Sequence, residues 1–387
     1  MPIQKLTIEQ FLELAQQYPV LDVRSPEEYN HAHIPGANNL PLFNNEERKA
    51  VGTAYKQQSR EVAIKIGLDY FGVKMKSMVE EAEKIIGNMQ LPIGKEQPLN
   101  KKILLESKEK QLPFANCILL HCWRGGMRSA GVAWLLDLYG FKVYTLVGGY
   151  KTYRKWVLAQ FEKEYNFNII GGYTGSGKTL LLHELEKEKQ IIIDLEELAH
   201  HKGSAFGALG ELPQPKQEMF ENLLAQHLSS AVSSNSIRRG DQGGQHPAPP
   251  IWLEDESQRI GNLQIPMPLW NTMRKCPVYF FDIPFEERLS YLTEEYGKFE
   301  KEKLVNAVIR IQKRLGGLET KNAINHLLEN DHRECFRILL TYYDKWYTKG
   351  LYNRENINAL LNKIPCIDVD TKTNIKKLAA CNTVATS

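Results

Sequence analysis

The sequence predicts an α/β fold with two parallel-sheet domains in series, the second of which has a helical C-terminal part. Short apolar runs of strand length alternate with longer stretches of helical pattern. This alternation starts again near residue 160, and a complete phosphate-binding loop follows the first strand of the new series. A chain of 387 residues is long enough for two domains that each bury a core.

The first predicted domain covers residues 1–158. Its strands are expected at residues 20–24, 118–121 and 143–147, and Gly148-Gly149-Tyr150 then turns into a helix over residues 151–164. The second domain covers residues 159–377. Its strands are expected at residues 167–170, 190–194, 251–254 and 278–282, with helices between them, one of which covers residues 217–228.

Two segments are predicted to be irregular. Residues 229–250 are rich in Ser, Gly, Gln and Pro, a composition that buries too little apolar area to offset its ordering entropy, so we expect a flexible surface loop. Residues 378–387 are expected to form a frayed tail.

Composition limits the class of protein. Hydrophobic residues make up 42% and charged residues 25% of the chain, as in soluble globular proteins. The six cysteines form no CxxC pair, which argues against a zinc cage or a disulfide framework and fits a reducing compartment. We find neither a signal peptide nor an apolar stretch of about 18 residues, so a cytoplasmic protein without a membrane partner is expected.

A cysteine loop is the first candidate site. It reads His121-Cys122-Trp123-Arg124-Gly125-Gly126-Met127-Arg128-Ser129 and follows a predicted strand. Loop N–H groups and the positive end of the next helix should lower the pKa of Cys122 and favour its thiolate. Arg124 and Arg128 add positive charge, so the loop could hold a terminal S–S⁻ or S–Se⁻ group, or a phosphate-like oxyanion. The other cysteines lack such surroundings and are expected to be structural.

A phosphate-binding loop is the second candidate site. The run Gly172-Tyr173-Thr174-Gly175-Ser176-Gly177-Lys178-Thr179 is a complete P-loop with a strand before it and a helix after it. Backbone N–H groups of Gly172, Gly175, Ser176 and Gly177 should face the phosphates, Lys178 should reach the terminal phosphate, and Thr179 should bind Mg²⁺.

An acid at the end of a neighbouring strand should complete the magnesium site. Glu254 and Asp255 are favoured, with Asp194 and Asp282 as alternatives. Mg²⁺ is the expected cofactor, and no tightly bound organic cofactor is expected. The motif itself does not imply ATP hydrolysis, because any phosphate or diphosphate could occupy it.

Net charge of +3 permits a nucleic-acid partner without requiring one. Basic residues gather along a predicted helix, and from charge alone a solvated helix face is favoured. They are Lys298, Lys301, Lys303, Arg310, Lys313 and Arg314.

Residues 21–29, 33–37 and 39–41 resemble the opening of a rhodanese domain, and Gly148-Gly149-Tyr150 resembles its closing segment. In that family the loop cysteine carries sulfur as a persulfide. The spacing Cys122-x5-Arg128 is one residue longer than the common rhodanese loop, and with His121 it fits the HCx5R pattern of cysteine phosphatases. The loop alone therefore leaves chalcogen transfer and phosphate-ester hydrolysis open.

A rhodanese-like domain followed by a P-loop NTPase-like domain resembles the tRNA 2-selenouridine synthase family. The resemblance extends over most of residues 18–347. It is carried by residues 44–48, 51–53, 55–60, 122–129, 171–179, 194–196, 200–207, 220–224, 254–261, 313–317 and 342–344.

The resemblance implies a transferase that converts wobble 2-thiouridine of tRNA to 2-selenouridine with selenophosphate, and that also attaches a geranyl group from geranyl diphosphate to the sulfur. It implies Cys122 as a selenyl-sulfide or persulfide carrier and the P-loop as the site of the prenyl diphosphate. Further implied partners are tRNA and an enzyme that supplies selenophosphate. Lys313 and Arg314 are expected to contact tRNA phosphates, with Lys56, Arg60, Lys202 and Arg310 as further candidates, and Tyr55 or Trp123 to stack on an extruded base.

Three alternatives stay open. They are an HCx5R cysteine phosphatase on a rhodanese-like fold, an ATP-dependent tRNA sulfurtransferase, and a non-catalytic nucleotide-sensing module that binds tRNA. The P-loop domain argues against the phosphatase, because ester hydrolysis needs no phosphate-binding loop besides the cysteine loop.

Overall fold

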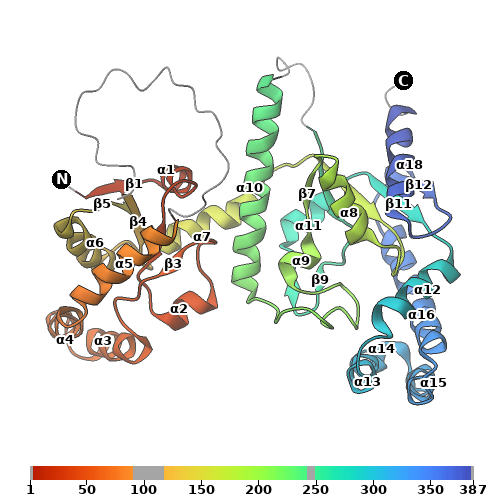
Figure 1. The fold of residues 1–387 in the computed structure, drawn as a ribbon, viewed down its shortest axis with the longest axis horizontal. Coiled ribbons are helices and arrows are strands. Elements are labelled where there is room, and N and C mark those ends of the chain that lie inside the picture. Colours follow the sequence, from red (N-terminus) through yellow and green to blue (C-terminus); the bar gives the residue numbers. More distant parts are fainter. Residues whose placement is uncertain (1–2, 90–116, 242–248, 385–387) are drawn as a thin grey trace. The chain divides into compact units, whose positions relative to one another are not determined.

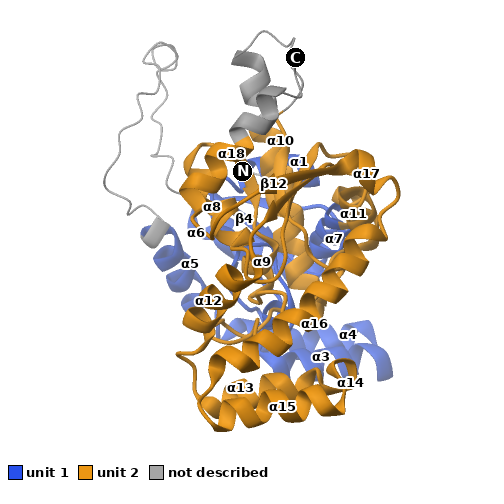
Figure 2. Ribbon diagram, turned by 90° about the vertical axis from the view of Figure 1, so that its right-hand side faces the viewer, with its two compact units in different colours: residues 1–157 blue, residues 158–387 orange. Residues whose placement is uncertain are grey.

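The computed structural model describes residues 3–89, 117–241 and 249–384, and the chain divides into two compact units, residues 1–157 and 158–387 (Figure 2). Each unit contains its own five-stranded parallel sheet with helices around it, so the predicted α/β class is confirmed. Helix α7 (Gly149–Gln160) leads from the first unit into the second.

The sheet of the first unit has the strand order β1-β5-β4-β2-β3. Its central strand β4 is buried at every residue but the first, and Ile118 and Leu120 pack in one core with Val132 and Leu136. Parallel strands covered on both faces require such continuous apolar runs. The strands are β1 (Gln4–Leu6), β2 (Val20–Asp22), β3 (Asn38–Asn39), β4 (Cys117–His121) and β5 (Lys142–Leu146). The helices before α7 are α1 (Ile8–Leu14), α2 (Pro26–His31), α3 (Asn45–Gln57), α4 (Arg60–Gly72), α5 (Met75–Met89) and α6 (Met127–Tyr139).

The main sheet of the second unit has the order β12-β11-β6-β8-β7, with β6 at its centre. Its strands are β6 (Phe167–Gly171), β7 (Ile191–Ile193), β8 (Ile251–Glu254), β11 (Val278–Asp282) and β12 (Leu361–Pro365), and a small antiparallel pair consists of β9 (Arg259–Ile260) and β10 (Leu263–Gln264). The helices up to β11 are α8 (Lys178–Lys187), α9 (Leu195–Ala199), α10 (Gln217–Asp241) and α11 (Met267–Met273). Binding sites of such sheets lie at the carboxyl ends of the strands, which is where both candidate loops begin.

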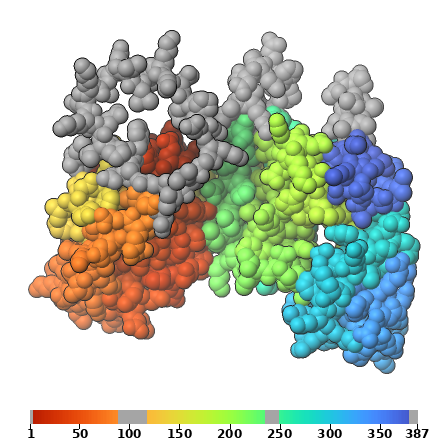
Figure 3. Space-filling model, viewed as in Figure 1, coloured from red at the N-terminus to blue at the C-terminus, as the bar shows by residue number. Residues whose placement is uncertain are grey.

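The predicted helical C-terminal part is confirmed. Helices α12 to α16 share a second core in which Leu304, Phe336 and Leu340 are fully buried or nearly so. Within the second unit, α13 to α15 lie at the end away from α18 (Figures 1 and 3). These helices are α12 (Phe285–Tyr296), α13 (Lys301–Arg310), α14 (Gln312–Leu315), α15 (Gly317–Leu328), α16 (His332–Tyr352), α17 (Ile357–Leu360) and α18 (Thr371–Val384).

All seven strands expected from apolar runs are present within two residues of the predicted ends. The strands that sequence reasoning missed are short or lie at sheet edges. In β12, for example, Ile364 is buried while Asn362 and Lys363 are exposed, so no apolar run marks it.

The prediction of a flexible loop over residues 229–250 is wrong for residues 229–241, which continue helix α10. Leu228 and Ala231 are buried, and the hydroxyls of Ser233 and Ser234 donate to carbonyls four residues earlier at 3.1 and 3.0 Å, which satisfies these serines inside a helix. Residues 242–248 lie outside the described residues.

Two smaller corrections concern the C-terminal half. Residues 378–384 belong to α18, in which Leu378 is buried, so the expected frayed tail is wrong there, and residues 385–387 lie outside the described residues. The single basic helix expected over residues 298–314 is broken at Ile311 into α13 and α14, and Lys298 precedes both. Among the described residues no helix has the length and apolar character needed to span a membrane.

Candidate functional site

The first site is built at the carboxyl end of β4. Cys122 follows the strand directly, is 3% exposed, and has its Sγ 3.2 Å from Ser129 Oγ at the start of α6. Burial opposes ionisation, but hydrogen bonds from the Ser129 hydroxyl and from the backbone N–H groups of Arg124, Ser129 and Gly126 outweigh it and lower the pKa of the Cys122 thiol. The thiolate predicted from the loop pattern is therefore favoured by this geometry.

Glycines close this loop against the segment after β5. Tyr150 N–H donates to Cys122 O at 2.9 Å, and a Cβ at Gly149 would lie 2.3 Å from that same oxygen. Gly125 and Gly149 both have positive φ, +63° and +58°. A side chain at either position would push the two backbones apart, so Gly-Gly-Tyr after β5 is part of the site.

The two arginines of the loop act differently from the expectation. Arg124 is exposed and contributes its backbone N–H to the thiol. The Arg128 guanidinium pairs with a carboxylate and donates to Glu28 Oε2 at 2.8 Å. Glu28 also accepts from the Ser25 backbone N–H in the capping box of α2. The start of α2 therefore fixes the carboxylate that binds Arg128.

His121 of the HCx5R pattern is buried completely and lies 3.8 Å from Asp22 through its Nε2. Burial lowers the pKa of His121, so a neutral ring is favoured. Asp22 itself pairs with the buried Arg24 at 2.6 Å, and that guanidinium lies over Tyr150, 3.8 Å from the ring centroid. This cluster fixes the end of β2 beneath the cysteine loop.

The second site is built at the carboxyl end of β6. The P-loop turns through Gly175 and Gly177, whose φ angles are +81° and +69°, and Lys178 opens α8 with its Nζ 3.3 Å from Gly172 O. Gly172 N–H donates to the Tyr347 hydroxyl at 3.1 Å, and Ser176 is buried.

A buried arginine supports the P-loop from α12. Arg288 donates to Thr174 O at 3.1 Å and makes a bidentate pair with Asp344 at 2.8 and 2.7 Å. Its guanidinium also lies 4.8 Å from the Tyr173 ring centroid. The Arg288 side chain therefore links the P-loop, α12 and α16.

The acid beside Thr179 is Glu196 and not one of the expected pair. Thr179 Oγ1 donates to Glu196 Oε2 at 2.6 Å, and Glu196 shares a hydrogen bond with Glu256. Burial raises the pKa of both carboxyls, well above the usual range for Glu256, while the Lys178 charge acts in the opposite direction. Two carboxyls joined by a hydrogen bond beside a hydroxyl supply the hard oxygen donors that Mg²⁺ prefers.

The expected metal ligands Glu254 and Asp255 are used elsewhere. Glu254 is completely buried and accepts from Leu195 N–H at 3.2 Å. Asp255 accepts from the Tyr347 hydroxyl at 2.7 Å and forms an ion pair with Arg354. Both expected ligands therefore have other partners in this structure. Sequence reasoning missed this pair because only tertiary packing brings Glu196 to Thr179 and Glu256 to Glu196.

The expected tRNA residues lie on surfaces. Lys313 and Arg314 are exposed on α14, and Lys313 lines a shallow hollow of about 560 Å³ together with Lys321 of α15. Lys202 pairs with Glu295 at 3.1 Å and is partly neutralised. In the first unit, the exposed Tyr55 and Trp123 are the candidate stacking rings, and Arg60 lies 3.8 Å from Met127 at the start of α6.

Comparison with known proteins identifies relatives of this chain. Residues 165–363 match the model of the tRNA 2-selenouridine synthase AAA domain, and residues 7–65 match that of the rhodanese-like domain. A tRNA 2-selenouridine synthase of Hydrogenovibrio crunogenus is 34% identical over 368 residues, covering 87% of this chain and 90% of its own. One from Sulfurovum sp. is 31% identical over 362 residues, covering 87% and 88%. One from Serratia proteamaculans is 36% identical over 284 residues, covering 73% and 65%.

The family models match segments of both units, and the first two relatives each cover 87% of the chain. The chain therefore belongs to the tRNA 2-selenouridine synthase family of enzymes.

Proposed function

We propose that this enzyme replaces the sulfur of wobble 2-thiouridine in tRNA with selenium from selenophosphate, through an S-geranylated intermediate made from geranyl diphosphate. The observation that carries the proposal is the pairing, in one chain, of a cysteine loop that favours a thiolate with a P-loop backed by a carboxyl pair. The relatives that match most of the chain are named for tRNA 2-selenouridine synthesis.

The P-loop is assigned the alkylation step. Its N–H groups and Lys178 bind the diphosphate of geranyl diphosphate. The thiouridine sulfur forms a bond to the first geranyl carbon, the carbon–oxygen bond breaks, and inorganic diphosphate leaves with both bonding electrons. The N3 proton of the thiouridine passes to solvent, so the alkylated base is neutral. Thr179, Glu196 and Glu256 would hold Mg²⁺, which would neutralise charge on the leaving diphosphate. Alkylation turns the sulfur on C2 into a better leaving group.

Cys122 is assigned the selenium step. Hydrolysis of selenophosphate gives phosphate and hydrogen selenide, and a small disulfide accepts the two electrons released when selenide and the Cys122 thiolate join as S–Se⁻. The terminal selenium then attacks C2, and geranyl thiolate leaves. A small thiol cleaves the S–Se bond, which releases 2-selenouridine, and a second thiol returns Cys122 to its thiol form. The N–H groups around Cys122 stabilise the anion at each stage.

Recognition of tRNA is assigned to exposed groups of both units. Lys313 and Arg314 are suited to backbone phosphates, and Tyr55 or Trp123 to stacking on the target base. The family name supports a tRNA substrate, and the selenophosphate supply enzyme is a further expected partner. We propose that all of this takes place in the cytoplasm, where tRNA is found.

The test uses the purified full-length protein with tRNA that carries 2-thiouridine. With geranyl diphosphate and Mg²⁺ alone, the wild type and Cys122→Ser should accumulate the geranylated nucleoside, while Lys178→Ala should not. With selenophosphate, a small thiol and its disulfide added, only the wild type should form 2-selenouridine. Full selenation by Cys122→Ser would overturn the role of the thiol. Hydrolysis of p-nitrophenyl phosphate that depends on Cys122, without any change in tRNA, would favour the phosphatase instead.

A further inference from the structure

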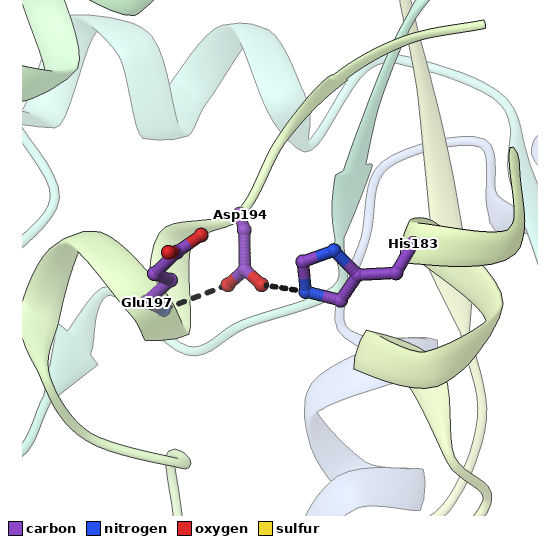
Figure 4. Close-up of side chains that lie close together, drawn as sticks. All are labelled: His183, Asp194 and Glu197. Atoms are coloured by element: carbon purple, nitrogen blue, oxygen red, sulfur yellow. Dashed lines mark hydrogen bonds and ion pairs between the residues drawn. The ribbon is translucent and has the colours of Figure 1, made fainter. Parts of the chain in front are cut away.

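A second cluster of ligand-type side chains lies on α8 and α9, outside the P-loop contacts described above. His183, Asp194 and Glu197 each offer one ligand atom, and these atoms all lie within 4.8 Å of one another (Figure 4). His183 comes from α8, Asp194 caps the first turn of α9, and Glu197 lies within that turn. Three separate side chains therefore converge from two elements.

The contact between His183 and Asp194 is short. His183 Nε2 pairs with Asp194 Oδ2 at 2.8 Å, and Asp194 also shares a side-chain hydrogen bond with Glu254. The Asp194 side chain is only 4% exposed. This spacing also suits two neighbouring ligands of one ion, because metal–ligand distances of about 2.1 Å place such ligands about 3 Å apart.

The surroundings add negative charge and orientation. Glu254 is completely buried and hydrogen-bonds to Asp194, so these two carboxyls lie together in the interior. Buried carboxylates are costly unless a cation or a proton compensates them. On its other side His183 Nδ1 lies 3.8 Å from Glu186, and a carboxylate behind the ring is the usual arrangement for a metal-binding histidine.

We propose that His183, Asp194 and Glu197 bind a divalent transition-metal cation. The mixed imidazole and carboxylate set favours Mn²⁺ or Zn²⁺ over Mg²⁺. The site is distinct from the Thr179–Glu196 position, although His183 follows Thr179 by four residues and so lies one helical turn away on the same face of α8. A cation here would tie α8 to the first turn of α9, which also carries Glu196.

Mn²⁺ is the probe of choice, since it binds thiols weakly and its free aqua ion can be counted by electron paramagnetic resonance. The full-length protein is titrated with Mn²⁺ in millimolar Mg²⁺, which keeps hard oxygen sites occupied. Asp194→Asn removes the charge but keeps the helix cap, because Asn is as good a cap as Asp. Glu197→Gln also keeps the helix cap, because Asp194 accepts from the Glu197 backbone N–H at 2.7 Å and not from its side chain.

The wild type should bind one Mn²⁺ at this site, and His183→Gln, Asp194→Asn and Glu197→Gln should each weaken it by at least about tenfold. His326→Gln is the matched control, because His326 faces Asp331 at 3.4 Å without a third ligand, and it should bind as the wild type does. Thr179→Ala should also keep the ion. The proposal is overturned if the three variants titrate like the wild type, if the wild type binds no Mn²⁺, or if Thr179→Ala alone abolishes binding.

Discussion

The Ser129 hydroxyl is predicted to stabilise the Cys122 thiolate, and Ser129→Ala tests this. In the thiol form the hydroxyl can donate to Gly126 O at 3.0 Å and accept from the thiol at 3.2 Å. In the thiolate form its single proton turns to the sulfur. The variant should therefore raise the pKa of Cys122, because the charged form loses a donor while the neutral form loses only an acceptor.

The magnitude follows from the contact. A hydrogen bond to a charged group contributes about 1.5–3 kcal/mol, and the hydroxyl gives up its bond to Gly126 O when it turns, so the lower end applies. About 1.4 kcal/mol corresponds to a tenfold change in an equilibrium constant. At a pH below the Cys122 transition, the thiolate fraction of Ser129→Ala should thus be about tenfold lower than that of the wild type.

The assay is a pH titration of the ultraviolet absorbance of thiolate, with the curve of Cys122→Ser subtracted. Background is low because burial raises the pKa of Cys335 to about 12 and of Cys366 to about 11, and also raises the pKa of Cys117 and Cys276. Ser77→Ala is the matched control, since that hydroxyl donates to Lys74 O in the same unit. If Ser129→Ala titrates like the wild type, the hydroxyl does not stabilise the thiolate and the reasoning is wrong.

Four further predictions concern both units. Gly149→Ala should destabilise the first unit by about 1–3 kcal/mol and reduce Cys122 reactivity, while Gly126→Ala, with no atom within 4 Å of its added Cβ, should lose less stability in the same denaturant titration. Arg288→Met should lower the free energy of unfolding of the second unit by about 3–5 kcal/mol, because Asp344 stays partly buried without its partner. Arg288→Lys should recover only part of this stability, as measured by thermal unfolding. The pKa of Glu28 is lowered because the Arg128 hydrogen bond and charge outweigh burial. The Glu28 carboxylate therefore stabilises the fold fully above the ordinary glutamate pKa, and this stabilisation is lost as pH falls through the lowered pKa. The difference in unfolding free energy between the wild type and Glu28→Gln should shrink on acidification, and a constant difference would contradict this. Lys313→Glu with Arg314→Glu should weaken tRNA binding and flatten its salt dependence, whereas Lys363→Glu on β12 should leave both nearly unchanged in filter-binding assays.

Much of the fold could be predicted because the inner strands of a parallel sheet are continuous apolar runs. Strands β4, β6 and β8 are buried almost throughout, and each carries such a run. The prediction ended helix α10 too early because the average composition of residues 229–250 hid the helical pattern of their first half. Its serines are compatible with a helix once their hydroxyls bond to the preceding turn, and the glycines begin only at Gly240.

The candidate sites were predictable where the chemistry lies in one contiguous segment. Cys122 and the P-loop are such segments, and their geometry agrees with the pattern. The carboxyl pair was not predictable, because Glu196 and Glu256 come from α9 and from the segment after β8, and only tertiary packing brings them to Thr179. The ion pair of Arg128 with Glu28 likewise joins residues 100 positions apart in the sequence.

The central claim is that one chain carries out alkylation at Lys178 and selenium transfer at Cys122. Nucleoside mass spectrometry of bulk tRNA tests it most directly, in a host deleted for this gene and complemented with the wild type, Cys122→Ser or Lys178→Ala. We expect 2-selenouridine only with the wild type, geranylated 2-thiouridine with Cys122→Ser, and unaltered 2-thiouridine with Lys178→Ala. Identical tRNA nucleosides in all four strains would contradict it.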